Sequence, residues 1–155
     1  MKLTLRLISI ALVSVFVAEV SHATEKKISK SDLPAAVQKT AQEQSKGATV
    51  KGYTQDNENG QLEYEVEMTL NGHSKDVSIA PDGNVLEVEE QVELGTLPAS
   101  VQSGLESKAG KGKITKTESI TKHGMIVAYE AQVTTAGRRS EIQVGPDGKP
   151  LNHEE

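Results

Sequence analysis

An internal repeat restricts the fold of this chain more than any other feature of its sequence. Three motifs occur twice in the same order: Leu-Pro-Ala-x-Val-Gln at residues 33–38 and 97–102, Tyr-Glu at 64–65 and 129–130, and Pro-Asp-Gly at 81–83 and 146–148. The offset is 64 residues for the first motif and 65 for the other two. A nearly constant offset indicates that one structural unit is used twice.

Each copy is predicted to begin with a helix. In the first copy Ser31 and Asp32 are expected to cap the helix, and Leu33, Val37 and Ala41 form an apolar stripe at helical spacing. Gly47 and Gly110 are expected to end the two helices because glycine adopts the left-handed conformation without strain. The equivalent stripe of the second copy is Leu97, Val101 and Leu105.

Strands are predicted to follow each helix. Residues 61–70 alternate strictly between apolar side chains and Glu63, Glu65 and Glu67, which indicates a strand with one buried and one wet face. Further strands are expected at residues 49–53, 77–79, 86–88, 114–120, 125–133 and 140–144, and only residues 149–151 remain for the last strand of the second copy. The predicted fold class is α+β: two tandem repeats, each one helix followed by an antiparallel β meander, with the helix on one sheet face. We expect the two copies to pack together or to share one sheet.

Residues 1–23 have the pattern of a secretory signal peptide. Lys2 and Arg6 precede a short apolar run that ends in Ser-His-Ala at residues 21–23. The predicted domains are therefore the signal peptide at 1–23, a first repeat at 24–91, a second repeat at 92–151 and a polar tail at 152–155. This organisation predicts a periplasmic or secreted protein with no stable membrane anchor.

Composition excludes several classes of function. The chain has no Cys, so it has no disulfide framework, thiolate metal site or Cys nucleophile. Its formal net charge is −5, which argues against nucleic acid as the main partner. The negative charge is uneven, because residues 24–90 carry 7 basic and 13 acidic side chains whereas residues 91–155 carry 8 of each.

The order of these motifs resembles the PepSY-like family, which is also described as beta-lactamase-inhibitor-like. The resemblance covers residues 29–91 and 92–151 and rests on the repeated Leu-Pro-x-x-Val, Tyr-Glu and Pro-Asp-Gly motifs. It implies a small bacterial envelope protein with a helix packed on one side of each sheet and a non-catalytic role. The mature chain departs from the lactamase inhibitors in having no Cys and three Tyr as its only aromatic residues, which argues against a tight inhibitor.

No arrangement in the sequence predicts catalysis, a metal site or a cofactor. His73, His123 and His153 do not occupy equivalent positions of the two copies, and no base and orienting group accompany a nucleophile. Residues 56–60 resemble the start of a calcium loop, with Glu67 twelfth, but the glycine is fifth rather than sixth. We expect a hairpin there, and we expect the protein not to be an enzyme.

The candidate binding surface is the wet face of the first sheet. Its predicted partner-binding residues are Glu63, Glu65, Glu67, Glu87 and Glu89. The leading hypothesis is a non-enzymatic module that holds an envelope protein, such as a peptidase, on this open face. The alternative is a low-affinity cation-binding or stress-protective envelope protein that uses the acidic first repeat. A third interpretation is that the acidic side chains only keep an exposed sheet soluble.

Overall fold

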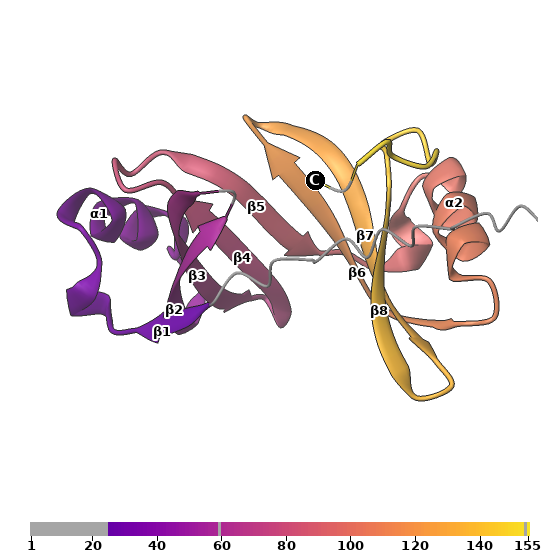
Figure 1. Ribbon diagram of the computed structural model, residues 1–155, viewed down its shortest axis with the longest axis horizontal. Coiled ribbons are helices and arrows are strands. Elements are labelled where there is room, and N and C mark those ends of the chain that lie inside the picture. The colour runs from indigo at the N-terminus through magenta and orange to yellow at the C-terminus, as the bar shows by residue number, and fades with distance from the viewer. Residues whose placement is uncertain (1–24, 59, 154) are drawn as a thin grey trace, which may run out of the picture.

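One antiparallel sheet runs through the whole computed structural model, which describes residues 25–58, 60–153 and 155 (Figure 1). The eight strands follow one another in chain order, so each strand pairs with the next. Their bounds are β1 Lys26–Ile28, β2 Thr49–Glu58, β3 Gln61–Leu70, β4 His73–Ile79, β5 Val85–Gln91, β6 Lys113–Lys122, β7 Met125–Thr135 and β8 Arg138–Val144. The predicted α+β class is confirmed, and the predicted signal peptide lies outside the described residues.

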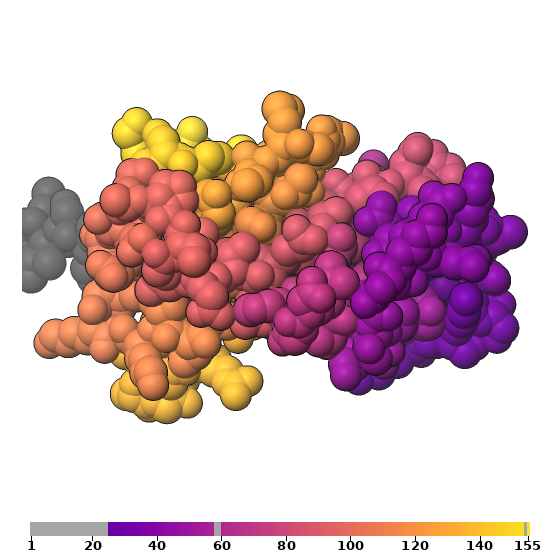
Figure 2. Space-filling view, turned by 180° about the vertical axis from the view of Figure 1, so that it is seen from behind, coloured from indigo at the N-terminus to yellow at the C-terminus, as the bar shows by residue number. Residues whose placement is uncertain are grey.

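Two helices cover one face of the sheet. Helix α1, Ala35–Gln44, contacts β4, and helix α2, Ala99–Ala109, contacts β6, β7 and β8. Short 3-10 turns precede them at η1 Lys30–Asp32 and η2 Leu94–Thr96. The helices lie at opposite ends of the long axis of the molecule (Figures 1 and 2).

The predicted cap of the first helix is wrong. Asp32 accepts hydrogen bonds from the Ser29 backbone nitrogen at 2.9 Å and from Ser29 Oγ at 2.7 Å, so it closes the 3-10 turn instead. Leu33 is extended, with φ −69° and ψ 140°, and separates this turn from α1. The cause is Pro34, because a residue before proline is excluded from the helical conformation by the proline ring.

Each helix has its own hydrophobic core. The first core joins Leu33, Val37 and Ala41 to the alternating apolar residues of β3 and β4, and the second joins Leu97, Val101 and Leu105 to β7 and β8. The period of two that predicted a half-buried strand at 61–70 is confirmed, since Tyr64, Val66 and Met68 are buried. A fully buried aliphatic side chain of this size contributes about 1.5–3 kcal/mol.

The two cores are connected by the pairing of β5 with β6. These strands are antiparallel, with Glu87 opposite Lys122 and Gln91 opposite Glu118. The expectation of a shared sheet is therefore confirmed. The pairing matters for function because it places side chains from both halves of the sequence on one continuous surface.

Sequence reasoning placed most strands but missed or shortened some at the edges. The hairpin expected near residue 60 is confirmed, because Glu58 pairs with Gln61 and Glu67 lies within β3. Strand β1 was not predicted, and β2 extends five residues beyond the expected end at Tyr53. After β8 the described residues form an isolated bridge between Val144 and Pro150 instead of a further strand, as the short C-terminal segment predicted. No described helix has the length and apolar character needed to cross a membrane.

Candidate functional site

The face of the sheet opposite the helices is strongly acidic. Since Tyr64 and Val66 point into the first core, the alternation of β3 directs Glu63, Glu65 and Glu67 to the opposite face. The register extends this face across the sheet: Glu65 pairs with Ser78 and Glu67 with Asp76 on β4. Glu87 and Glu89 of β5, Glu118 of β6, Glu130 of β7 and Glu141 of β8 continue it.

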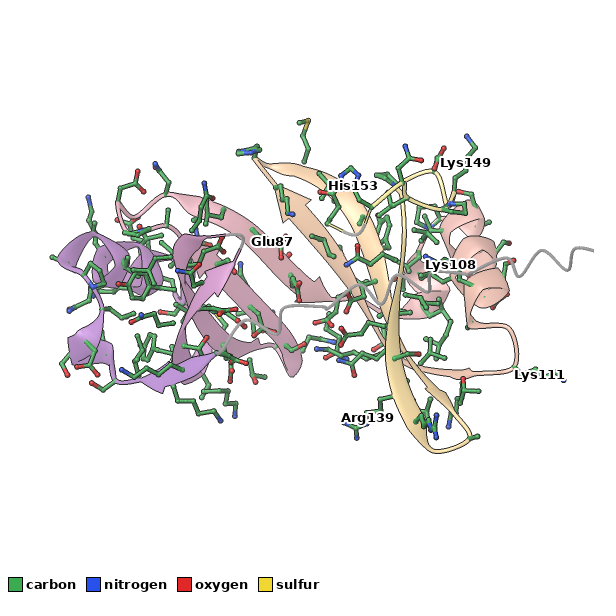
Figure 3. The ribbon with its side chains drawn as sticks, viewed as in Figure 1. Glu87, Lys108, Lys111, Arg139, Lys149 and His153 are labelled. Carbon is green, nitrogen blue, oxygen red and sulfur yellow. The ribbon has the colours of Figure 1, made fainter. Side chains whose placement is uncertain are left out.

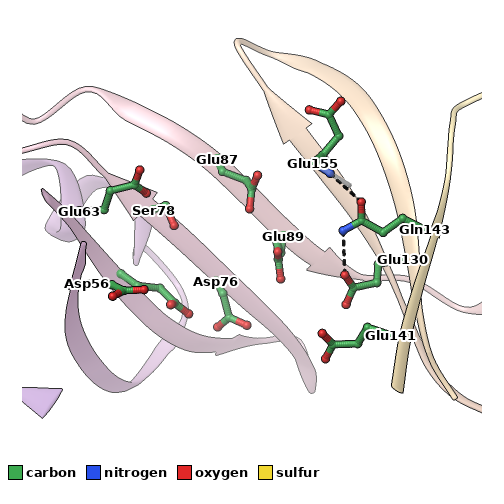
Figure 4. Close-up of a pocket in the computed structure, with 11 residues that line it drawn as sticks. Asp56, Glu63, Asp76, Ser78, Glu87, Glu89, Glu130, Glu141, Gln143 and Glu155 are labelled. Carbon is green, nitrogen blue, oxygen red and sulfur yellow. Dashed lines mark hydrogen bonds between the residues drawn. The ribbon is translucent and has the colours of Figure 1, made fainter. Parts of the chain in front are cut away.

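A cavity of about 460 Å³ lies on this acidic face (Figure 4). Among the described residues, nine carboxylates and two uncharged side chains line it: Asp56, Glu63, Glu65, Asp76, Ser78, Glu87, Glu89, Glu130, Glu141, Gln143 and Glu155. We call this the acidic cavity. Its walls come from β2–β5 on one side and from β7, β8 and Glu155 on the other. Twist of the continuous sheet therefore brings carboxylates from both halves of the sequence around one space.

Burial and mutual repulsion raise the pKa of carboxyl groups in the acidic cavity. Burial is the main cause at Glu89, where repulsion from Glu87, Glu130 and Glu118 adds to it and the pKa reaches about 8. Burial is also the first cause at Glu65, followed by repulsion from Asp76, and the pKa rises to about 7. Carboxyl groups with such pKa values bind protons near neutral pH, so a bound cation would replace protons in this cavity.

Three carboxylates from neighbouring strands approach one another closely on the acidic face of the sheet. Asp76, Glu89 and Glu118, from β4, β5 and β6, each offer an oxygen, and these oxygens all lie within 4.8 Å of one another. Burial raises the pKa of Asp76 as well. The buried Glu118 also receives the Lys116 ammonium at 2.6 Å and the Ser74 hydroxyl at 3.3 Å. Among the described residues, Lys116 is thus a compensating cation on the Glu118 side of the cluster.

The other wall of the acidic cavity is a hydrogen-bonded chain that includes Glu155. The Glu155 backbone nitrogen donates to Gln143 Oε1 at 2.8 Å, and Gln143 Nε2 donates to Glu130 Oε2 at 3.0 Å (Figure 4). Lys122 lies between the walls and pairs with Glu87 at 3.1 Å and with Glu155 at 3.5 Å. These contacts hold Glu87, Glu130 and Glu155 in place around the acidic cavity.

Four of the five predicted partner-binding residues line the acidic cavity. They are Glu63, Glu65, Glu87 and Glu89, whereas Glu67 lies on the same face beside Asp76 but outside the lining. Their role in binding a partner stays a prediction. Sequence reasoning did not select Asp56, Asp76, Glu118, Glu130, Glu141, Gln143 or Glu155. Alternation within β4 and β7 was a usable signal for Asp76 and Glu130, but nothing local indicated that the two sheet halves would face one another.

The three histidines outside the predicted signal peptide are dispersed. His73 begins β4, His123 lies in the β6–β7 hairpin turn, and His153 lies after β8. His153 approaches Glu155 at 3.7 Å, and the Nδ1 atom of His73 is buried without a hydrogen-bond partner among the described residues. Each histidine therefore belongs to a different part of the fold.

Comparison with known proteins identifies the fold. No family model matches the sequence, and no curated protein matches it. A "putative periplasmic" protein from Bacteroides eggerthii has a similar structure, with a TM-score of 0.65 and 18% identity over 77% of this chain and 86% of that one. A DUF2874 family protein from Bacteroides ovatus gives a TM-score of 0.60 at 18% identity, covering 77% of this chain and 85% of that one.

A third similar structure names the fold class. It is a BLIP-like protein from Bacteroides fragilis, with a TM-score of 0.57 and 17% identity over 78% of this chain and 85% of that one. The chain therefore has a BLIP-like α+β fold, in agreement with the beta-lactamase-inhibitor-like architecture expected from its motifs. At these identities the likeness defines the fold alone.

Proposed function

We propose that this protein is a non-enzymatic binding module of the periplasm whose acidic cavity holds a positively charged segment of an envelope protein. The observation that carries the proposal is the lining of the acidic cavity, in which nine of eleven residues are Asp or Glu. Charge of one sign in a concave surface attracts a partner of the opposite sign and speeds its association.

Two observations support the periplasmic location. The sequence begins with a basic, apolar and small-residue pattern typical of an exported protein. The similar structure from Bacteroides eggerthii is named a "putative periplasmic" protein, which agrees with that pattern.

Matched contacts support the proposal that the module consists of two PepSY-like copies. The side-chain nitrogen of Gln38 donates to the Leu33 carbonyl at 2.9 Å, and Gln102 donates to the Leu97 carbonyl at 2.7 Å. Gly83 and Gly148, in the two Pro-Asp-Gly turns, have φ values of +91° and +81° and pack against the first turns of α1 and α2. Equivalent residues thus make equivalent contacts in both halves, as duplication of one unit requires.

The chemistry of the acidic cavity favours a weak, salt-sensitive partner over a tight one. Tight interfaces are centred on buried Trp, Tyr and Arg side chains, and none of these is among the described residues that line the acidic cavity. A lysine-rich or arginine-rich loop of an envelope protein, such as a peptidase, has the complementary charge. Binding would release the protons held by Glu65 and Glu89.

Calorimetric titration with an oligolysine peptide tests this proposal. We expect binding at pH 8 that is weakened by the double variant Glu65→Gln and Glu89→Gln. The matched control is Glu43→Gln with Glu106→Gln, which removes the same charge from exposed positions on α1 and α2. Equal loss in both double variants, or no binding by the unmodified protein, would contradict a role for the acidic cavity. Affinity capture from envelope extract with the same pair of variants then identifies the natural partner.

Low-affinity cation binding is the second candidate function, and the close approach of Asp76, Glu89 and Glu118 favours it. Hard cations such as calcium prefer several carboxylate oxygens, and these three side chains supply them. Calorimetry with calcium and with transition metals distinguishes the two functions. Heat that disappears in the Glu118→Gln variant would favour the cation, whereas no heat and no change in melting temperature would remove this candidate.

A further inference from the structure

Among residues 25–58, 60–153 and 155, none pairs with the first half of strand β8 on the side away from β7, so this half is an edge of the described sheet. The strand order places β7 on one side of β8, and the bridge from Val144 to Pro150 covers only its C-terminal end. Residues 138–141 are all exposed. This half lies at the end of the β7–β8 hairpin, whereas α2 reaches the other end of β8, where Lys108 Nζ donates to the Gln143 carbonyl at 2.9 Å (Figure 1).

Backbone alternation shows which groups of β8 face outward. The Gly145 nitrogen donates at 2.8 Å to the Lys149 carbonyl, which lies on the side of β8 away from β7. The β7–β8 register has no bulge between Arg138 and Val144. Because backbone groups alternate between the two sides of an antiparallel strand, the N–H and C=O groups of Glu141 and Arg139 also point outward. Arg139 and Glu141 thus each present one backbone N–H donor and one C=O acceptor on the side of β8 away from β7.

We propose that β8 pairs with β8 of a second copy of this chain, in an antiparallel register centred on Ser140. That register places Arg139 of each copy opposite Glu141 of the other, on the same face of the sheet. Four outward backbone groups per copy then pair, and two ion pairs form across the junction. In the single chain Arg139 and Glu141 are exposed, and neither forms an ion pair within the described residues.

Charge selects this register over its neighbours. In a two-fold junction, side chains that share a face of one sheet must share the same face of the enlarged sheet. Each allowed register therefore has one central residue that lies opposite the same residue of the second copy. Centring on Arg139 would oppose two arginines, and centring on Glu141 would oppose two glutamates. Like charges directly opposite one another are destabilising, so the Ser140-centred register is favoured among the three.

Charge also disfavours pairing of β8 with the opposite edge of the sheet. That edge is β1, a strand of three residues that contains Lys26 and Lys27. Pairing β8 with β1 of another copy would place these lysines near Arg138 and Arg139. Such a head-to-tail junction would also leave edges free for open-ended assembly. The β8 junction closes on itself and gives a dimer.

Dimerisation would join the two acidic faces. The two-fold axis is perpendicular to the sheet, so both acidic cavities open on the same side of the enlarged sheet. Glu141 lines the acidic cavity and would have Arg139 of the second copy beside it. The proposal does not rest on the proposed function, because edge pairing needs no ligand in the acidic cavity.

Charge reversal tests the junction. With Arg139→Glu, the junction contains two places where a glutamate lies opposite a glutamate. With Glu141→Arg, it contains two places where an arginine lies opposite an arginine. The controls, Lys111→Glu and Glu106→Arg, make the same charge changes at exposed positions outside β8. Lys111 follows α2, whereas Arg139 lies on β8 (Figure 3). The measurement is sedimentation equilibrium over a concentration series. The protein is expressed from the full sequence and purified in the form that is recovered from the cells. Circular dichroism verifies that each variant is folded.

We expect a monomer–dimer equilibrium for the unmodified protein and for both controls, and weakening by about tenfold or more in each β8 variant. An equimolar mixture of the two β8 variants is expected to dimerise again, because every Glu–Glu or Arg–Arg opposition becomes Glu–Arg. A monomer at all concentrations overturns the proposal. A dimer that both β8 variants retain, or a mixture that fails to regain it, also overturns it.

Discussion

The α-carbon of Gly148 packs directly on Ser100 in the first turn of α2, so that a Cβ at Gly148 would overlap the Ser100 carbonyl oxygen. The same turn in the first half is looser, since a Cβ at Gly83 would lie 3.0 Å from the Ala36 carbonyl oxygen. Each Pro-Asp-Gly turn therefore sets how closely a helix lies to its sheet. This contact is made at the end of the helix and leaves the acidic face undisturbed.

Gly148→Ala is expected to destabilise the protein by about 3 kcal/mol, from a left-handed backbone and from overlap with Ser100. Gly83→Ala should cost less, because its neighbour is farther away. Gly124→Ala is the matched control: φ is +75° with no atom within 4 Å of an added Cβ, so only the backbone cost of about 1 kcal/mol remains. Urea unfolding measures all three, and equal losses would show that the helix contact is unimportant.

The free energy of unfolding is expected to fall as pH rises from 4.5 to about 8. The pKa values of Glu65 and Glu89 rise from 4.5 to about 7 and about 8, so the folded protein retains protons that the unfolded chain has released. The contribution is fully present below pH 4.5 and lost above pH 8. After allowance for solvent screening of these partly exposed groups, we expect a loss of about 2 kcal/mol.

Urea unfolding at pH 5 and pH 8.5 checks this prediction. The double variant Glu65→Gln and Glu89→Gln should be nearly as stable at pH 8.5 as at pH 5, because neither amide ionises. Glu43→Gln with Glu106→Gln should keep the pH dependence of the unmodified protein. A double variant of the acidic cavity with the full pH dependence would assign the effect to other groups.

Binding of oligolysine is expected to weaken steeply with salt. The Debye length falls from about 30 Å at 0.01 M to about 8 Å at 0.15 M ionic strength, so fewer carboxylates of the acidic cavity act on a bound cation. Titrations at several sodium chloride concentrations measure the slope. An affinity that does not change with salt would mean that contacts other than charge hold the peptide.

Leu105→Ala is expected to cost about 2–5 kcal/mol. Leu105 is fully buried in the second core, and its truncation leaves a cavity that the surrounding strands cannot fill. Met125→Ala is the control, because Met125 is 66% exposed and should change stability by less than about 0.5 kcal/mol. Chemical unfolding of both variants provides the comparison, and a small loss at Leu105 would contradict the assigned core.

Much of the local structure could be predicted from the sequence because it depends on neighbours in the chain. Alternation at residues 61–70 identified a half-buried strand with its outward glutamates, and the helical stripe of Leu97, Val101 and Leu105 identified a buried helix face. The misassigned cap at Asp32 also has a local cause. Pro34 restricts Leu33 to an extended conformation, and this restriction follows from two adjacent residues of the sequence.

Periodicity over a few residues was enough to predict both helices, most of the strands and the acidic face of residues 61–70, because it depends only on neighbours in the chain. The pairing of β5 with β6, and the twist that makes one surface of the sheet, became evident only in three dimensions. Asp76, Glu89 and Glu118 come together through that pairing, although residues 89 and 118 are far apart in the chain. Long-range pairing and sheet twist depend on the summed packing of many side chains, and no local pattern encodes them.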